Sequence, residues 1–261
     1  MSQDSSQDII VERRVGDQPV ARLTLNRPDK RNTISWEMRQ QVEDLFLELG
    51  RDRELRVVIV TGAGGLFSSG GDMRGFLEHE PYEFAHLGVN LAAAERCPKP
   101  VIAAVDGFCF GAGLELALTC DIRVCSDRAE FALPETLRGQ MPGSGGSQRL
   151  PRLIGWSRAK EMILRGRRMP APEALACGLV CEVTAPEALA DAALAIADEL
   201  CRRSPLALTT LKETLNIGMD TNLSAAMEIE RKAYSMLRST HDYHEGVTSF
   251  FEKRDPEFEG R

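Results

Sequence analysis

The sequence that decides the fold is VIAAVDGFCFGAGLELALTCDIRV, residues 101–124. Residues 100–105 form a short apolar run of the kind found in a buried strand. This run leads into a glycine-rich turn at residues 107–113. A helix is predicted over residues 114–120 and a second strand over 122–125. Apolar strands that alternate with loops and helices predict an α/β protein with much parallel pairing.

The same alternation precedes this stretch. Residues 20–25 are typical of a short strand. A helix is predicted from about Ser35, because serine suits an N-cap and apolar residues recur after it at helical spacing. Residues 57–60 predict another buried strand, which enters the glycine-rich sequence GAGGLFSSGG at residues 62–71.

The C-terminal part of the sequence is helical throughout. Beyond about residue 185, helices are predicted over 186–203, 205–217 and 222–238, followed by a polar tail. We therefore expect a core over residues 1–199 and a helical appendage over residues 200–261.

The composition limits the classes of partner. The chain has 261 residues and a formal net charge of −7, so no global positive field attracts nucleic acid or anionic lipid. No apolar run approaches the roughly 18 residues of a membrane span, and the first residues, MSQDSSQD, lack a signal pattern. We expect a cytoplasmic protein that binds neither nucleic acid nor membrane. The seven cysteines lack the spacings of a zinc site, so no metal is expected.

Several common enzyme signatures are absent from the sequence. A dinucleotide-binding fingerprint starting at Gly62 and Gly64 requires a third glycine where this chain has Phe67. No tyrosine is followed by lysine four residues later, as a short-chain reductase requires. The chain also lacks a P-loop and the G-x-S-x-G sequence of serine hydrolases.

Glu115 is a carboxylate in an apolar setting. It lies in the sequence GAGLELAL, at the start of a predicted helix that is apolar on nearly every face. Burying a carboxylate is costly unless it is paired or hydrogen-bonded. Two interpretations remain open: a structural glutamate held by backbone amides or an arginine, or a catalytic group.

Glu135 and two glycine-rich loops favour the catalytic interpretation. Alone, Glu135 is typical of an ordinary acid at a helix start. The loops at residues 69–72 and 111–113 each follow a buried strand and precede a predicted helix, so each exposes backbone N–H groups. Two such loops suggest a pair of amide donors aimed at one oxygen, and two carboxyls beside them would move protons next to a polarised carbonyl.

Five motifs together resemble the enoyl-CoA hydratase/isomerase (crotonase) family. They are NRPDKRN at residues 26–32, FSSGGD at 67–72, AAVDGFCFGAGLELALTCDIRV at 103–124, FALPE at 131–135 and PGSGGSQRLPRLIG at 142–155. The resemblance runs from about residue 8 to the C-terminus. It implies a ClpP/crotonase-like α/β fold, a spiral of ββα units. Residues 200–261 would then assemble the chain into a trimer or a dimer of trimers.

The resemblance also implies the roles of individual residues. Glu115 and Glu135 match the acid–base glutamates of hydratases, and Gly71 and Ala112 match the positions whose N–H groups form the oxyanion hole. The matches to coenzyme A or substrate contacts are Lys30, Arg31, Ser69, Gly70, Asp72, Met73 and Arg74, with Phe250 and Lys253 reaching a neighbouring subunit's coenzyme A. Lys30 and Arg31 are equally typical of a solvated turn. Asp29 replaces the usual basic residue beside them.

Retention of both glutamates favours an enoyl-CoA hydratase. Such an enzyme adds water syn to a 2-enoyl-CoA thioester, giving a 3-hydroxyacyl-CoA, in fatty-acid or related acyl-CoA catabolism. It needs no cofactor, because coenzyme A is part of the substrate. The alternatives are an isomerase or thioester hydrolase of the same fold, or a binding module for RNA or protein. Short straight-chain, branched and aryl acyl groups all remain open.

Overall fold

Six strands form the larger sheet, in the order β1-β2-β3-β4-β6-β9. The computed structural model describes residues 7–261, apart from the side chains of residues 85–87. The strands are β1 (Ile9–Glu12), β2 (Val20–Leu25), β3 (Val57–Gly62), β4 (Val101–Val105), β6 (Ile122–Ser126) and β9 (Glu182–Thr184). β1 runs antiparallel to β2, and every other neighbouring pair is parallel.

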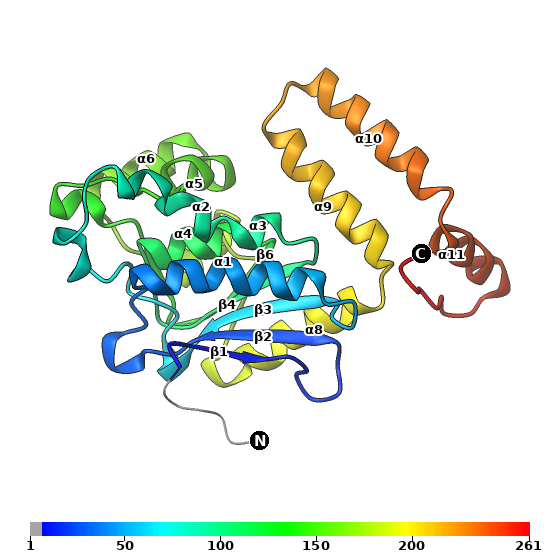
Figure 1. The fold of residues 1–261 in the computed structure, drawn as a ribbon, viewed down its shortest axis with the longest axis horizontal. Coiled ribbons are helices and arrows are strands. Elements are labelled where there is room, and N and C mark those ends of the chain that lie inside the picture. Colours follow the sequence, from blue (N-terminus) through cyan, green and yellow to red (C-terminus); the bar gives the residue numbers. More distant parts are fainter. Residues whose placement is uncertain (1–6) are drawn as a thin grey trace.

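Both faces of this sheet are covered by helices. Successive side chains of a strand point to opposite faces, so Val58 packs in the core that contains α1 (Trp36–Arg51) and α4 (Ala112–Thr119). Val57 packs on the other face against α8 (Leu189–Cys201). Figure 1 shows α1 and α8 on opposite sides of the sheet. Burial on both faces explains why these strands are continuous apolar runs.

A smaller sheet runs alongside and completes the ββα repeat. It contains β5 (Phe108–Phe110), β7 (Glu130–Ala132) and β8 (Met169–Pro170). β5 and β7 are parallel, and a parallel bridge between Ser68 and Cys109 adds the segment after β3 to the same sheet. The strands β3, β4 and β6 are therefore each followed by a second extended segment in the smaller sheet. The ends of these segments lie together at one edge.

The remaining helices cover the core or extend from it. They are α2 (Leu87–Leu91), α3 (Ala93–Arg96), α5 (Gly146–Ile154), α6 (Trp156–Arg165), α7 (Ala171–Ala176), α9 (Pro205–Met219), α10 (Leu223–Leu237) and α11 (His241–Glu252). α9 and α10 lie side by side and project away from the sheets (Figure 1). No helix in the described part of the chain has both the length and the apolar character needed to cross a membrane.

Most of the predicted elements are confirmed, with two corrections. β2 has the predicted bounds, and the Ser35 side chain caps α1 by accepting a hydrogen bond from the Met38 N–H group. α4 begins two residues earlier than predicted, at Ala112, because Gly111 turns the chain sharply at φ 50° and ψ −125°. The polar tail predicted after residue 238 is wrong for residues 241–252, which form α11 with Thr240 as its N-cap.

A buried lysine fastens α9 to the core. Lys212 Nζ donates hydrogen bonds to Asp121 Oδ2 at 2.7 Å, Ala94 O at 2.9 Å and Lys99 O at 3.0 Å. All three donor positions of the ammonium group are therefore used, which offsets the cost of burying its charge. The middle of α9 is thus fixed to the core at α3 and at the residues that precede β4 and β6.

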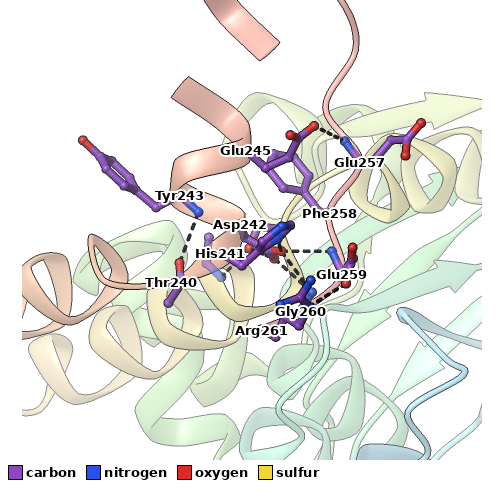
Figure 2. A network of polar contacts seen from close by, with 12 residues as sticks. Thr240, His241, Asp242, Tyr243, Glu245, Glu257, Phe258, Glu259, Gly260 and Arg261 are labelled. Carbon is purple, nitrogen blue, oxygen red and sulfur yellow. Dashed lines mark hydrogen bonds and ion pairs between the residues drawn. The ribbon is translucent and has the colours of Figure 1, made fainter. Parts of the chain in front are cut away.

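The C-terminal segment is held by a second buried charge, Asp242. Its carboxylate accepts hydrogen bonds from the Glu259 N–H group at 2.9 Å, the Gly260 N–H group at 3.1 Å and Ser204 Oγ at 2.6 Å. Figure 2 shows the last residues folded back onto the start of α11 around this side chain. Asp242 is 2% exposed, so these donors replace water around its charge. A sequence that is rich in polar residues therefore acquires an ordered structure.

Replacing Asp242 by alanine is expected to release residues 257–261. The change leaves two backbone N–H groups and a buried hydroxyl without their acceptor, at about 1–3 kcal/mol for each unsatisfied group. Hydrogen exchange followed by mass spectrometry should show at least about tenfold faster exchange in this segment, since about 1.4 kcal/mol corresponds to tenfold. Glu252→Ala, which removes an exposed acid from the same helix, is the control and should leave exchange unchanged. Equal exchange in the Asp242 variant and the wild type would show that this carboxylate does not hold the segment.

Candidate active site

Two loops meet at the edge where the second segments of the ββα units end. The Ser68 N–H group donates to Phe108 O at 2.8 Å, and the Phe110 N–H group donates to Ser68 O at 2.9 Å. These bonds set a parallel register between the segment after β3 and the strand β5. Just beyond these bonds, Gly70 lies against Phe110 and Gly111, so Gly71 and Ala112 follow directly on two adjacent segments. The two glycine-rich loops singled out in the sequence are therefore neighbours.

Glycine is required where the loops approach each other. Gly70 has φ 113° and Gly111 has φ 50°, both in the region that side chains disfavour. A Cβ atom on Gly70 would lie 3.3 Å from Phe110 O. A Cβ atom on Gly111 would lie 3.6 Å from Gly70 Cα and 3.0 Å from Glu135 Oε1. The same close approach brings the Glu135 carboxyl next to both loops.

The backbone N–H groups that follow these glycines are available as donors. Neither Gly71 nor Ala112 donates a backbone hydrogen bond within residues 7–261. Ala112 is the first residue of α4, where the N–H group has no partner inside the helix. Its φ is not among the positive values, which occur outside glycine at Arg31, Asn32 and Lys253. Alanine therefore fits this position without backbone strain.

Glu115 is fixed by a loop from a distant part of the sequence. It lies on α4 and is 3% exposed. Its Oε1 atom accepts hydrogen bonds from the Ser144 N–H group at 2.6 Å and the Gly146 N–H group at 3.0 Å. The structural interpretation from the sequence, a buried glutamate held by backbone amides, is therefore correct. The same bonds orient the carboxylate, so they also suit a catalytic role.

Glu135 has a different environment. It begins the 3₁₀ helix η5 (Glu135–Arg138) just after β7, and its Oε2 atom is buried without a hydrogen-bond partner in the described part of the chain. Burial raises the pKa of the Glu135 carboxyl to about 7, and the charge of nearby Glu115 adds to the rise. A carboxyl of this kind carries a proton over much of the neutral pH range. Paired carboxyls in such unlike surroundings are typical of an acid and a base.

The residues predicted to contact coenzyme A gather beside the first loop. The Ser69 N–H group donates to Arg31 O at 3.0 Å, which joins the turn of Lys30 and Arg31 to this loop. Lys30, Arg31, Met73 and Arg74 are exposed, and Gly70 is buried in the loop itself. Exposed positive charges next to the polar backbone of a loop suit the binding of an anionic ligand. The individual contacts with coenzyme A remain predictions.

Asp72 belongs to the framework of this loop. Its carboxylate pairs with the guanidinium group of buried Arg27, with Oδ2 3.1 Å from Nη2. Arg27 also donates to Thr33 O at 3.0 Å. The ion pair therefore fastens the loop of Gly71 to the turn that precedes α1. A direct contact of Asp72 with the substrate remains a prediction.

Phe250 and Lys253 lie away from the other predicted residues. Both are at the end of α11, which Figure 1 places far from α4 within the same chain. Phe250 is 77% exposed, and Lys253 ends the helix with φ 56°. The structure therefore does not bring them to this site. Their predicted contact with a neighbouring subunit's ligand remains a prediction.

An aromatic cluster borders the loop of Gly71. A Cβ atom on Gly71 would lie 2.9 Å from the Phe76 ring. Phe76 packs edge-to-face on Phe84, with ring centroids 5.5 Å apart, and the Trp36 ring stacks on His79 at 3.9 Å. Three of these side chains come from residues 75–91, and their stacking gives this border of the loop a flat, aromatic character.

Two features of the site were not predicted from the sequence: the burial of Arg39, and the hydrogen bonds from the Ser144 loop to Glu115. Arg39, on α1, is buried next to the Ser144 loop, and that loop supplies the hydrogen bonds to Glu115. The available signal was the position of Arg39 directly after Met38, which begins the buried face of α1. A charged residue at the margin of an apolar helical face is more often solvated, so this signal is weak.

The pKa of Glu135 predicts a dependence of stability on pH. The native pKa of about 7 lies above the usual value of 4.5. The stabilising contribution of the protonated group is therefore complete below about pH 4.5 and is lost as the pH rises through 7. Urea unfolding of the wild type and Glu135→Gln should show the variant gaining relative stability between pH 5 and 7, with a constant difference above about pH 8. A difference that does not vary with pH would contradict the raised pKa.

Comparisons with known proteins agree on one family. Residues 16–261 match the family model for Enoyl-CoA hydratase/isomerase. The 2,3-dehydroadipyl-CoA hydratase of Escherichia coli is 37% identical over 262 residues, which cover 97% of this chain and 99% of that protein. The carnitinyl-CoA dehydratase of Citrobacter koseri is 40% identical over 251 residues, which cover 93% and 96%.

A solved structure extends the agreement to the fold. The crystal structure of an enoyl-CoA hydratase from Bacillus anthracis superposes with a TM-score of 0.92 at 35% identity, covering 98% of this chain and 100% of that one. The α/β crotonase fold expected from the sequence motifs, with helices at the C-terminus, is thereby confirmed.

Proposed function

Because the chain belongs to the enoyl-CoA hydratase/isomerase family, we propose that it is an enoyl-CoA hydratase. It adds water syn to the double bond of a 2-enoyl-CoA thioester and releases a 3-hydroxyacyl-CoA. One observation carries the proposal: Glu115 and Glu135 lie beside two neighbouring loops that present N–H groups, and their surroundings differ. One carboxyl is held by backbone donors, and the other has a pKa near neutrality.

The thioester oxygen is bound between the N–H groups of Gly71 and Ala112. Attack of water at C3 shifts negative charge onto this oxygen, and fixed donors stabilise that charge without reorganising. The first of these donors is fixed by the Arg27–Asp72 ion pair, and the second by the start of α4. Binding of the oxygen therefore polarises the conjugated double bond toward attack.

The two glutamates divide the proton transfers. Glu115 accepts a proton from the attacking water, because its carboxylate is oriented by the Ser144 and Gly146 N–H groups. Glu135, protonated at its raised pKa, delivers a proton to C2. The oxygen of water is then bonded to C3. Glu115 has gained one proton, and Glu135 has given one up. Proton exchange restores the starting state.

Coenzyme A enters as part of the substrate, and the reaction requires no further cofactor or metal. The exposed cations Lys30, Arg31 and Arg74 provide a surface for its phosphates. α10 has no buried residue, which suits a helix that packs in an oligomer. We infer a trimer or a dimer of trimers in which Phe250 and Lys253 reach the coenzyme A of a neighbouring subunit.

The proposed reaction does not specify the acyl group of the substrate. The relatives act, by their names, on dehydroadipyl and carnitinyl thioesters, so the reaction type is shared across different acyl groups. The aromatic cluster around Phe76 provides a flat wall that suits compact or planar acyl groups. A panel of straight-chain, branched and aryl 2-enoyl thioesters tests this, with loss of conjugated enoyl absorbance as the readout.

Exchanging either glutamate for glutamine tests the assignment of the acid–base pair. Glu115→Gln and Glu135→Gln should each lower kcat by about 10²–10⁴-fold, because each keeps the shape of the side chain and removes proton transfer. Binding of the CoA ester, measured by calorimetry, should change little. Near-native turnover in either variant would remove that residue from the mechanism.

Ala112 provides a test of the oxyanion hole that changes neither glutamate. Proline is tolerated at the first position of a helix, so Ala112→Pro deletes the N–H group while α4 can still begin there. Loss of one such donor should lower kcat by about 10²–10³-fold. Ala112→Gly keeps the N–H group and is the matched control, with activity close to the wild type. Both variants must first show native circular dichroism, and a folded proline variant with wild-type turnover would overturn the placement of the thioester oxygen.

A further inference from the structure

Arg39 is a buried cation at the base of the proposed site. It lies in the first turn of α1, is 3% exposed, and its Nη1 atom donates a hydrogen bond to Ser144 Oγ at 3.1 Å. Its Nη2 atom is 3.7 Å from the position that a Cβ atom on Gly71 would occupy. One guanidinium group therefore contacts the Ser144 loop and approaches the loop of Gly71.

A short chain of hydrogen bonds leads from Arg39 to Glu115. Arg39 donates to the Ser144 hydroxyl, and the Ser144 N–H group donates to Glu115 Oε1 at 2.6 Å. The electrostatic link is also direct: burial lowers the pKa of Arg39 to about 10, and the negative field of Glu115 opposes the fall. Arg39 therefore stays cationic at neutral pH. A fixed cation favours the charged form of a nearby carboxyl.

Other charged groups face this region from the elements packed around it. Arg149, on α5, donates to Ser144 O at 3.3 Å, but it also bonds through Nε to Glu95 Oε2 at 2.9 Å, so an acid on α3 compensates its charge. Glu135, on η5, lies close enough that the charge of Glu115 raises its pKa, whereas Arg138 lowers the pKa of Glu135. Among these groups, Arg39 is the cation that interacts electrostatically with Glu115.

We propose that Arg39 is a positioning residue that fixes the Ser144 loop and maintains Glu115 as the carboxylate that accepts a proton from water. The inference rests on the hydratase function proposed above. It assigns to α1 a part in the reaction beyond packing. Arg39 acts through Ser144 and through its charge, and it does not touch the reacting atoms.

The first test is the pH profile of kcat/KM for the wild type, Arg39→Met and Arg39→Lys. Methionine removes the charge, so the acid limb should move to higher pH, because a neighbouring cation favours the charged form of a carboxyl. At pH values below this limb, kcat should be about tenfold lower than in the wild type at the same pH, with KM within about twofold. Lysine keeps the charge but loses the guanidinium geometry, so kcat should fall while the acid limb stays in place.

A matched control removes a buried arginine outside the site. Arg123 is 8% exposed and donates to Leu179 O at 2.8 Å, and the acid that acts on its charge is Asp121. Arg123→Met should lower the melting temperature and leave the acid limb unmoved. Two results would overturn the proposal. One is a folded Arg39→Met whose acid limb coincides with that of the wild type, and the other is an equal shift of the acid limb in Arg123→Met.

A second measurement does not depend on enoyl-CoA hydration. Removing a buried cation disfavours the charged form of a carboxylate beside it, so stability should be lost as the pH rises. Between pH 5 and 7.5, the melting temperature of Arg39→Met should therefore fall relative to Arg39→Met/Glu115→Gln by more than that of the wild type falls relative to Glu115→Gln. Parallel melting curves in both pairs would overturn the coupling. A wild type without hydratase activity but with this difference would contradict the proposed function alone.

Discussion

The site depends on the parallel hydrogen bonds that join the segment around Ser68 to the strand β5. The bonds from Ser68 N to Phe108 O and from Phe110 N to Ser68 O determine which residues of the two loops lie opposite each other. A shift by one residue would turn every side chain to the other face and separate the N–H groups of Gly71 and Ala112. Gly70 and Gly111 permit the close approach, because their backbone angles and the surrounding space exclude a side chain. The arrangement of the proposed site is thus a consequence of strand register.

The same edge supplies the two carboxyls of the proposed acid–base pair. Glu115 emerges from the helix that follows β5 and finds backbone donors at Ser144 and Gly146. Glu135 follows β7, the neighbour of β5, and finds few polar partners, so burial raises its pKa to about 7. Two identical side chains thereby have unlike surroundings. The fold produces this difference by burial and hydrogen bonding, and the charge of Glu115 adds to the rise of the Glu135 pKa.

Local patterns predicted the elements and much of the site, and long-range packing decided the rest. The strand at residues 20–25 and the Ser35 cap follow from neighbouring residues, and the buried carboxylate of Glu115 stood out against its apolar helix. The donors to Glu115 lie about thirty residues further on, and no local pattern connects them. Arg39 was missed because only tertiary packing buries it. α11 was missed because its polar sequence is stabilised by the chain end folding back onto Asp242.

The central claim is that the paired glutamates hydrate a thioester held between the two loops. The most direct measurement is nuclear magnetic resonance of the product formed from a 2-enoyl-CoA in deuterated water. The account predicts a 3-hydroxyacyl-CoA with the hydroxyl group at C3 and one deuterium at C2, added to the same face of the former double bond. A shifted double bond, free coenzyme A, or deuterium added to the opposite face would contradict it.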